Sequence, residues 1–253
     1  MSETIEIVDI LNVPVHCVSP DDILDAIDKS IQLQNRALIT YVHLHAINLA
    51  QSDSLLREVL GTSLINYCDG EGVRWGARIL KKNIPFRIPL TRWIYDVLDH
   101  CEKNNHSVYF LGCADCVLRD AVSTIRKKNP SLDIAGFHHG YFQTDKAEVK
   151  LVLKELDEIR PDVLFIGMGM PLQELWIKDH WEKLPNSVIM TAGSCFEYIA
   201  GAKPRCPTWL ADNGLEWFHR LLIEPRKVWK RYLIGIPIFF ARILYKRLSR
   251  KNR

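Results

Sequence analysis

The sequence predicts an α/β protein, a doubly wound, Rossmann-like and mostly parallel sheet with helices on both faces, followed by a basic helical C-terminal appendage. Short apolar, β-prone runs alternate with helical patterns between residues 37 and 191, as crossover helices alternate with parallel strands. With 253 residues, 47% of them hydrophobic, the chain can bury one large core. Beyond residue 203 the composition changes, and Trp, Arg and Pro gather.

The elements are expected in the following order. An opening segment spans Ile5 to Val15, and Ser19-Pro20-Asp21-Asp22 then predicts a helix start, because Ser caps helices and Pro suits the first helical position. That helix runs to about Gln32. The expected strands are Ala37 to Val42, Leu64 to Tyr67, Ser107 to Leu111, Leu132 to Ala135, Asp162 to Ile166 and Ser187 to Thr191. The expected helices are 53–60, 71–81, 91–104, 115–128, 145–159 and 172–183.

Two regions are predicted, an α/β body at 1–202 and an appendage at 203–253. From Arg226 to Arg253 there are ten Lys or Arg and no acid, and removing them from the net charge of +3 leaves −7 on the preceding residues. This asymmetry indicates an anionic partner for the tail, either phospholipid or nucleic acid. The apolar stretch Leu233 to Ala241, interrupted by Pro237, is too short to span a bilayer and suits a helix in the membrane interface; a merely solvated helix is the alternative.

Several classes of protein are disfavoured. No apolar run has the roughly 18 residues of a membrane span, and the opening residues lack the pattern of a signal peptide, so we expect a cytoplasmic chain. The seven cysteines are odd in number and scattered, which favours reduced thiols. Cys113 and Cys116 lack a second pair at zinc spacing and fit a strand-to-helix turn. We expect neither a metal nor a cofactor.

Polar residues and glycines follow several predicted strands, at the edge where such sheets bind ligands. Asp69 follows the strand that ends at Tyr67, with Gly70 and Gly72 beside it; the carboxylate suits a general base, or alternatively a helix cap. Gly112 precedes a helix whose free amides could bind a diphosphate, unless it only makes a tight turn. Gly169 and Gln173 lie in a strand-to-helix turn, where the Gln amide could contact a sugar hydroxyl or be simply solvated.

Histidines and arginines supply further candidates. His139, in a loop with His138 and Tyr141, could contact a ligand, whereas metal binding is disfavoured. His43 and His45 are expected to alternate on a strand or at its end and so to face opposite sides. Arginines among the aromatic residues of the C-terminal region could neutralise a diphosphate leaving group, and surface salt bridges are their alternative role. These arginines are Arg205, Arg220 and Arg226.

Taken in order, six motifs carry a resemblance. They are Cys68-Asp69-Gly70-Glu71-Gly72-Val73, Gly136 to Phe142, Gly167 to Glu174, Gly193 to Gly201, Arg205-Cys206-Pro207-Thr208-Trp209 and Gly214 to Leu221. From roughly Ala37 to Tyr232 the chain resembles the WecG/TagA/CpsF glycosyltransferase family, glycosyltransferase family 26.

The resemblance implies a metal-independent, inverting transferase. Such an enzyme moves a sugar from a UDP-sugar to a polyprenyl-diphosphate-linked glycan for surface polysaccharide, at the inner face of the cell membrane. It implies Asp69 as the base, with Arg87 and Gln173 in the same pocket and Glu197 as a nucleoside contact. It also implies a membrane-attached appendage that contributes Arg205, Arg220 and Arg226, and further copies of the chain are candidate partners.

Two departures from the family pattern fall near the expected sugar pocket. His43 stands where the family usually has Asn, so we expect His43 to take the substrate-binding position. The stretch from Arg87 to Arg92 lacks the Gly and Asp of the family pattern. The sequence therefore does not predict which sugar is used.

Two other classes compete with this interpretation. A nucleic-acid-binding protein would use the basic tail, but the body is acidic and polar residues end its strands. A Rossmann dehydrogenase would need the GxGxxG fingerprint, which the sequence lacks.

Overall fold

The protein is built on one eight-stranded sheet with the strand order β1-β2-β4-β3-β8-β7-β5-β6. The computed structural model describes residues 5–142 and 145–251. Its strands are β1 (Ile7–Ile10), β2 (Val13–His16), β3 (Ala37–Val42), β4 (Ile65–Cys68), β5 (Val108–Gly112), β6 (Ile134–His138), β7 (Val163–Gly167) and β8 (Val188–Thr191). Among the described strands, only β1 runs antiparallel to its neighbour. The predicted mostly parallel sheet is confirmed.

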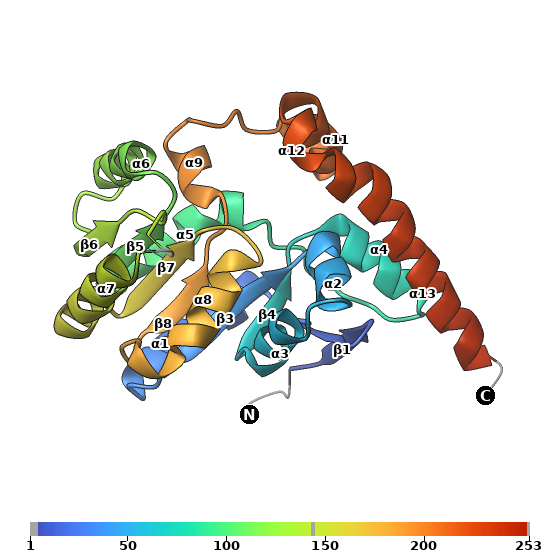
Figure 1. Cartoon of the computed structure of the whole chain (residues 1–253), viewed down its shortest axis with the longest axis horizontal. Coiled ribbons are helices and arrows are strands. Elements are labelled where there is room, and N and C mark those ends of the chain that lie inside the picture. The colour runs from blue at the N-terminus through green and yellow to red at the C-terminus, as the bar shows by residue number, and fades with distance from the viewer. Residues whose placement is uncertain (1–4, 143–144, 252–253) are drawn as a thin grey trace.

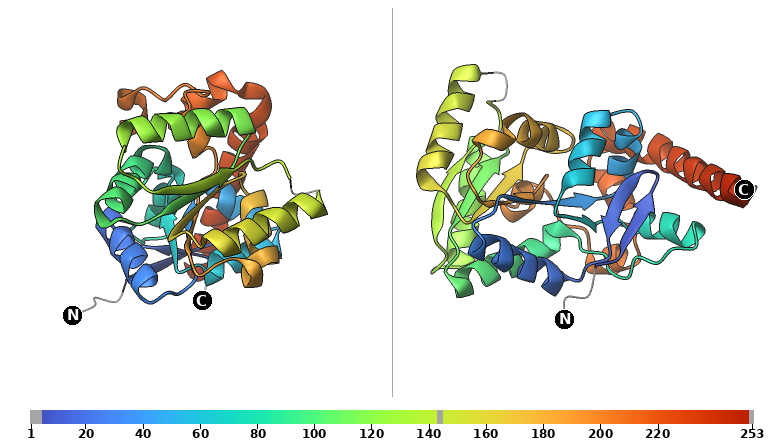
Figure 2. Two further views of the ribbon diagram at one scale, coloured as in Figure 1. Left: turned by 90° about the vertical axis from the view of Figure 1, so that its left-hand side faces the viewer. Right: turned by 90° about the horizontal axis from the view of Figure 1, so that it is seen from below.

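Helices cover both faces of this sheet (Figure 2). Successive residues of β5 show why: Val108 and Phe110 enter the core of one face, and Tyr109 and Leu111 enter the core of the other. The first core packs against α1 (Pro20–Gln32), α5 (Leu90–Asn104), α6 (Asp115–Lys128) and α9 (Cys195–Ile199). The second packs against α3 (Ser54–Thr62), α7 (Lys146–Ile159) and α8 (Leu172–His180), which a 3-10 turn at Trp181–Lys183 extends.

Three features differ from the sequence prediction. The opening segment is a hairpin of β1 and β2, and two short helices, α2 (Leu44–Ala50) and α9, follow β3 and β8. The strand expected at Leu132 to Ala135 is β6, which begins and ends later. Because α2 begins immediately after β3, His43 and His45 do not alternate on a strand. His43 is the N-cap of α2 and His45 lies in its first turn, so both face the same side, with ring centroids 6.0 Å apart.

The C-terminal segment is mostly helical in its described part. It contains α10 (Thr208–Asp212), α11 (Glu216–Ile223), α12 (Pro225–Trp229), a π-helical turn (Lys230–Ile234) and α13 (Gly235–Lys251). In Figure 1, α11 and α12 lie above the sheet and α13 runs down beside α4 (Glu71–Ile79). Pro237, which interrupts the apolar stretch from Leu233 to Ala241, lies near the start of α13, shortly after the π-helical turn.

One face of α13 packs closely on the body. Phe239 and Ile243 are completely buried in a core shared with α2, α4 and the β1–β2 hairpin. Arg242 donates to Asn48 Oδ1 at 2.9 Å, and Lys246 pairs with Asp9.

The boundary between the α/β body and the appendage, predicted at residue 202, stays a prediction. The predicted end of the appendage, residue 253, lies outside the described residues. Within residues 5–142 and 145–251, none of the helices is both long and apolar enough to cross a bilayer.

Candidate active site

A cavity of about 500 Å³ opens at the carboxyl ends of the central strands. Residues just after β3, β4 and β8 form its floor, together with the loop after β7. Its roof is formed by α11, α12, the π-helical turn and the start of α13. The C-terminal segment therefore completes the cavity, because the sheet edge alone supplies only the floor.

Asp69 lies on the floor, directly after β4. It does not cap the helix that follows, because Gly70 is the N-cap of α4 and no side chain makes the cap bond. Its Oδ1 instead accepts a hydrogen bond from the Leu90 amide at 3.2 Å. Burial, followed by the negative charge of Glu216, raises the pKa of Asp69 to about 7 against the opposing effects of the Leu90 amide and Arg87. Of the two roles predicted for Asp69, the cap is ruled out and the base remains.

Two arginines of the roof have buried Nε–H groups without hydrogen-bond partners. Arg220, on α11, and Arg231, in the π-helical turn, both line the cavity. Among the described residues, neither Nε–H group has a hydrogen-bond partner, although both atoms are buried and Arg220 Nε lies 3.8 Å from Glu224 Oε2, within ion-pair distance. A buried guanidinium N–H without a partner is costly, and an anionic ligand would satisfy it. The roof is therefore suited to bind a diphosphate.

The histidines of the wall are uncharged at neutral pH. Burial, followed by the charge of Arg231, lowers the pKa of His43 well below its usual range. The same two causes, with Arg220, lower the pKa of His45 to about 4. The positive charge of the cavity therefore comes from arginine and lysine, and the imidazoles act as neutral hydrogen-bonding groups.

Gln173 was expected to contact the sugar, but it does not line the cavity, and its side chain is completely buried beneath the floor. Its Oε1 accepts from the amides of Gly169 at 3.2 Å and Gly193 at 3.0 Å, and its Nε2 donates to Glu174 Oε1 at 2.7 Å. Gly169 and Gly193 both line the cavity. Gln173 thus joins the two loops of the floor from below, because its Oε1 accepts from an amide of each loop.

Five predicted site residues do come together in the cavity: His43, Asp69, Arg87, Gly169 and Arg220. Arg87 also donates to the Ala211 carbonyl at 3.2 Å, which ties α10 to the body.

The remaining predicted residues lie elsewhere. Arg205 is exposed and donates to the Tyr95 hydroxyl at 3.1 Å, and Arg226 is exposed on α12. Glu197 pairs with Lys203 at 2.6 Å. Gly112 and His139 follow β5 and β6, and neither lines this cavity. None of these five residues lines the cavity, and their substrate contacts stay predictions.

Sequence reasoning missed other lining residues: Tyr41, His45, Glu216, Trp217, Arg231 and Tyr232. Glu216 and Trp217 belong to the sixth motif, which could have pointed to them. Arg231 is one of many basic residues of the tail, and no local signal distinguishes the one that turns inward.

Two clusters hold metal-type ligand atoms within 4.8 Å of one another: Asp28 with His100 and His106, and His138 with His139 and Glu148. In the first, both imidazole Nε2 atoms approach the same Asp28 oxygen, at 2.8 and 2.9 Å. In the second, His139 Nδ1 accepts from the Tyr141 amide, so Nε2 carries the proton and faces Glu148 at 3.1 Å. Hydrogen bonds account for both clusters, and neither lines the cavity.

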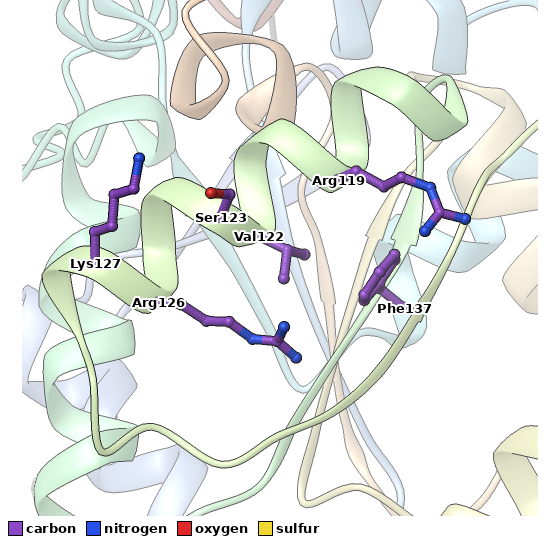
Figure 3. Close-up of a pocket in the computed structure, with 6 residues that line it drawn as sticks. All are labelled: Arg119, Val122, Ser123, Arg126, Lys127 and Phe137. Atoms are coloured by element: carbon purple, nitrogen blue, oxygen red, sulfur yellow. The ribbon is translucent and has the colours of Figure 1, made fainter.

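A separate open depression of about 420 Å³ lies between α6 and β6. Figure 3 shows Arg119 and Arg126 beside the apolar side chains of Val122 and Phe137, whereas Lys127, which also lines the depression, points away from them. Because no carboxylate or imidazole lines it, this surface offers no group that could act as a base near neutral pH. The cavity under α11 and α12 is therefore the candidate active site.

Comparison with known proteins gives consistent matches. The model of the family described as "Glycosyl transferase WecG/TagA/CpsF family" matches residues 8–253. The chain is 31% identical over 214 residues to an N-acetylglucosaminyldiphosphoundecaprenol N-acetyl-beta-D-mannosaminyltransferase of Staphylococcus aureus strain NCTC 8325 / PS 47, covering 84% of this chain and 81% of the relative. Proteins of the same name from strains COL and MRSA252 match with the same identity and coverage.

Proposed function

The chain belongs to the WecG/TagA/CpsF family of glycosyl transferases, and we propose that it moves a sugar from a UDP-sugar to a polyprenyl-diphosphate-linked sugar. The relatives' name specifies transfer of an N-acetylmannosaminyl group to an N-acetylglucosaminyl diphosphoundecaprenol, which supports an acceptor of this class. The product would belong to a capsule, an exopolysaccharide or a teichoic acid. One observation carries the proposal: Asp69 shares a cavity with two arginines whose buried Nε–H groups make no hydrogen bond within the described residues.

The proposed reaction is a single displacement. Asp69 takes the proton of the acceptor hydroxyl, and the hydroxyl oxygen attacks the anomeric carbon of the donor sugar. The bond from that carbon to the diphosphate breaks, and UDP leaves with the electron pair. Arg220 and Arg231 stabilise the charge that develops on the diphosphate. Attack opposite the leaving group inverts the anomeric configuration.

We propose that the reaction needs no metal ion, because guanidinium groups neutralise the leaving group. Turnover is then expected to persist in EDTA and to disappear in Arg231→Gln. An enzyme that EDTA inactivates, and that a divalent cation restores, would contradict this part of the proposal.

The tail is proposed to hold the cavity at the membrane, where the polyprenyl chain of the acceptor resides. Opposite the packed face of α13, exposed apolar side chains recur at helical spacing: Ile234, Ile238, Leu244, Tyr245 and Leu248. Such a stripe beside basic residues suits the bilayer interface. Nucleic-acid binding by the tail is less well supported, because Arg231 lines the cavity while Arg242 and Lys246 are engaged with Asn48 and Asp9.

The first test is thermal stability against UDP, GDP, CDP, NAD and a short DNA duplex in EDTA. A ligand that binds only the folded state raises the melting temperature. UDP alone should stabilise the protein, and a series of UDP-N-acetylhexosamines with an N-acetylglucosaminyl diphosphopolyprenol acceptor should then give transfer. A salt-sensitive response to DNA with none to UDP would instead support nucleic-acid binding.

A further inference from the structure

The roof of the cavity contains an acid beside one of its arginines. Glu224 lies between α11 and α12, four residues after Arg220, and its side chain is 15% exposed. Glu224 Oε2 is 3.8 Å from Arg220 Nε. Carboxylate and guanidinium groups four residues apart in a helix can form a hydrogen-bonded ion pair, with N and O about 2.7–2.9 Å apart. Such a pair would occupy the Nε–H group that the proposed reaction uses to stabilise the leaving diphosphate.

A lysine from the connection between α9 and α10 approaches the same carboxylate oxygen. Lys203 Nζ lies 3.6 Å from Glu224 Oε2, and the lysine side chain is 15% exposed. Two bonds hold Lys203 at α9, because its amide donates to the Glu197 carbonyl at 3.1 Å and its Nζ pairs with Glu197 Oε2 at 2.6 Å. Figure 1 shows the chain passing from α9 to α11 and α12 above the sheet. Lys203 therefore brings a fixed positive charge to the roof.

The Glu224 carboxylate is ionised at neutral pH. Burial acts to raise the pKa of Glu224, but the positive charges of Lys203, Lys227 and Arg220 bring it below its ordinary value. Lys227 Nζ lies 3.3 Å from Glu224 Oε1, but the Lys227 side chain is 74% exposed, and exposed ion pairs contribute little. Lys203 is therefore the partly buried cation that can compensate the carboxylate in place of Arg220.

We infer that Lys203 is a positioning residue of the transfer reaction, which pairs with Glu224 and so keeps Arg220 available for the diphosphate of the UDP-sugar. This inference rests on the proposed function. Without the lysine, Glu224 would attract Arg220 more strongly, and closing their 3.8 Å separation to a hydrogen bond would withdraw the guanidinium from the ligand. Lys203 does not line the cavity, so its effect reaches the ligand through Glu224 and Arg220.

The test measures the dissociation constant of UDP by titration calorimetry in EDTA. Lys203→Met is expected to weaken UDP binding by about 10-fold or more, as for loss of one hydrogen bond to a charged group. The double variant Lys203→Met, Glu224→Gln should recover most of the affinity, because it has no carboxylate at this position to capture Arg220. Lys203→Arg keeps the charge and should bind UDP nearly as tightly as the wild type does. In transfer assays, KM for the UDP-sugar should follow the UDP affinity, and KM for the acceptor should stay unchanged.

Lys178→Met is the matched control, because it removes another lysine ion pair, with Glu58, and neither residue lines the cavity. It should leave the UDP affinity unchanged. A second double variant, Lys203→Met, Glu197→Gln, separates the two carboxylates that Lys203 contacts. If affinity returns with Glu197→Gln and not with Glu224→Gln, the unpaired Glu197 caused the loss and the inference is overturned.

Melting temperatures without ligand distinguish a loss of affinity from a loss of structure. A double variant with Glu224→Gln that melts no higher than Lys203→Met and still binds UDP more tightly supports the inference. If it binds no better, Lys203 only fastens the roof, and the inference fails. If the wild type does not bind UDP, the proposed function fails and this inference with it; if the wild type binds UDP and Lys203→Met matches it, only this inference fails.

Discussion

At the residue scale, the raised pKa of Asp69 determines how activity should depend on pH. A base must be ionised to accept a proton, and the Asp69 pKa of about 7 leaves it protonated below neutrality. We therefore expect kcat/KM to rise with pH through about 7 and then level off. Asp69→Asn should lower kcat by roughly 10²- to 10⁴-fold while UDP still raises the melting temperature. Initial rates across pH 5 to 9 check both statements.

Two neighbours of Asp69 provide matched controls for that profile. Glu216 raises the Asp69 pKa and Arg87 lowers it. Glu216→Gln should therefore move the rising limb to lower pH, and Arg87→Gln should move it to higher pH. A limb that stays in place in both variants would show that another group titrates, and Asp69 would lose its assignment as the base.

Glu174 supports a second prediction, on stability. Its side chain is completely buried, and this burial raises its pKa from an ordinary 4.5 to about 7. The folded state therefore holds the proton more tightly than the unfolded state does, and stability falls as pH rises from 4.5 to about 7, by about 3 kcal/mol in total. Glu174→Gln removes this dependence and should be the more stable protein at pH 8.

Urea denaturation of both proteins at pH 5 and pH 8 measures this effect. At pH 5 the Glu174 carboxyl is mostly protonated and the two free energies of unfolding should be similar. A Glu174→Gln protein that is less stable at pH 8 would show that the carboxylate is ionised in the native state and has a compensating partner.

At the element scale, the contact between α4 and α13 depends on the small size of Gly76. A Cβ at this position would lie 2.7 Å from Phe239 Cζ, closer than packed carbon atoms allow. Gly76→Ala should destabilise the protein by roughly 1–3 kcal/mol and reduce activity, because the displaced α13 continues the turn that carries Arg231.

Gly61→Ala is the matched control for this substitution. Gly61 also lies in a helix, α3, but a Cβ there would meet nothing within 4 Å. Since Ala favours helix over Gly by roughly 1 kcal/mol, Gly61→Ala should be neutral or stabilising. Thermal unfolding of the two variants separates the steric effect from helix propensity, and equal melting temperatures would contradict the proposed packing role.

Elements with strong local signals were predictable from the sequence, and those fixed by tertiary contacts were not. Buried parallel strands are apolar runs, so β3, β5, β7 and β8 were found nearly at their observed bounds. The β1–β2 hairpin turns through Leu11 and Asn12, both with positive φ, and Leu gives no turn signal. Helix α2 was missed because a histidine caps it.

The same distinction applies to the site. Asp69 and Gly169 follow strands, and topology brings strand ends together, so a sequence pattern could place them. The arginine that enters the cavity, Arg231, lies within a π-helical turn, and no local sequence pattern predicts such a turn. For this reason the exposed Arg226 was predicted and Arg231 was missed. Gln173 was recognised as a motif residue, but only the three-dimensional contacts show that it braces the floor.

At the scale of the whole molecule, the positions of the charges and of the exposed apolar side chains favour one orientation at a surface. Ten cations and no acids lie from Arg226 onward, while the preceding residues carry a net −7 against the total of +3. The same segment roofs the cavity and exposes the apolar stripe of α13. A negatively charged bilayer would therefore attract the tail and repel the body, which directs the roofed side of the molecule toward the lipid.

We therefore predict that the protein binds anionic vesicles through α13. A triple variant, Ile238→Gln, Leu244→Gln and Leu248→Gln, should fold normally because these side chains are 42%, 49% and 61% exposed. Its binding to phosphatidylglycerol vesicles should fall by at least about 100-fold, since each apolar side chain contributes roughly 1.5–3 kcal/mol when buried. Leu151→Gln, on α7 and 66% exposed, is the control and should bind as wild type does.

The activity of the triple variant should depend on where the acceptor is. Transfer to a polyprenyl-linked acceptor in vesicles should fall with binding, whereas transfer to a short-chain acceptor in solution should not. If the triple variant still sediments with vesicles, another surface meets the membrane and the apolar stripe of α13 has a different role.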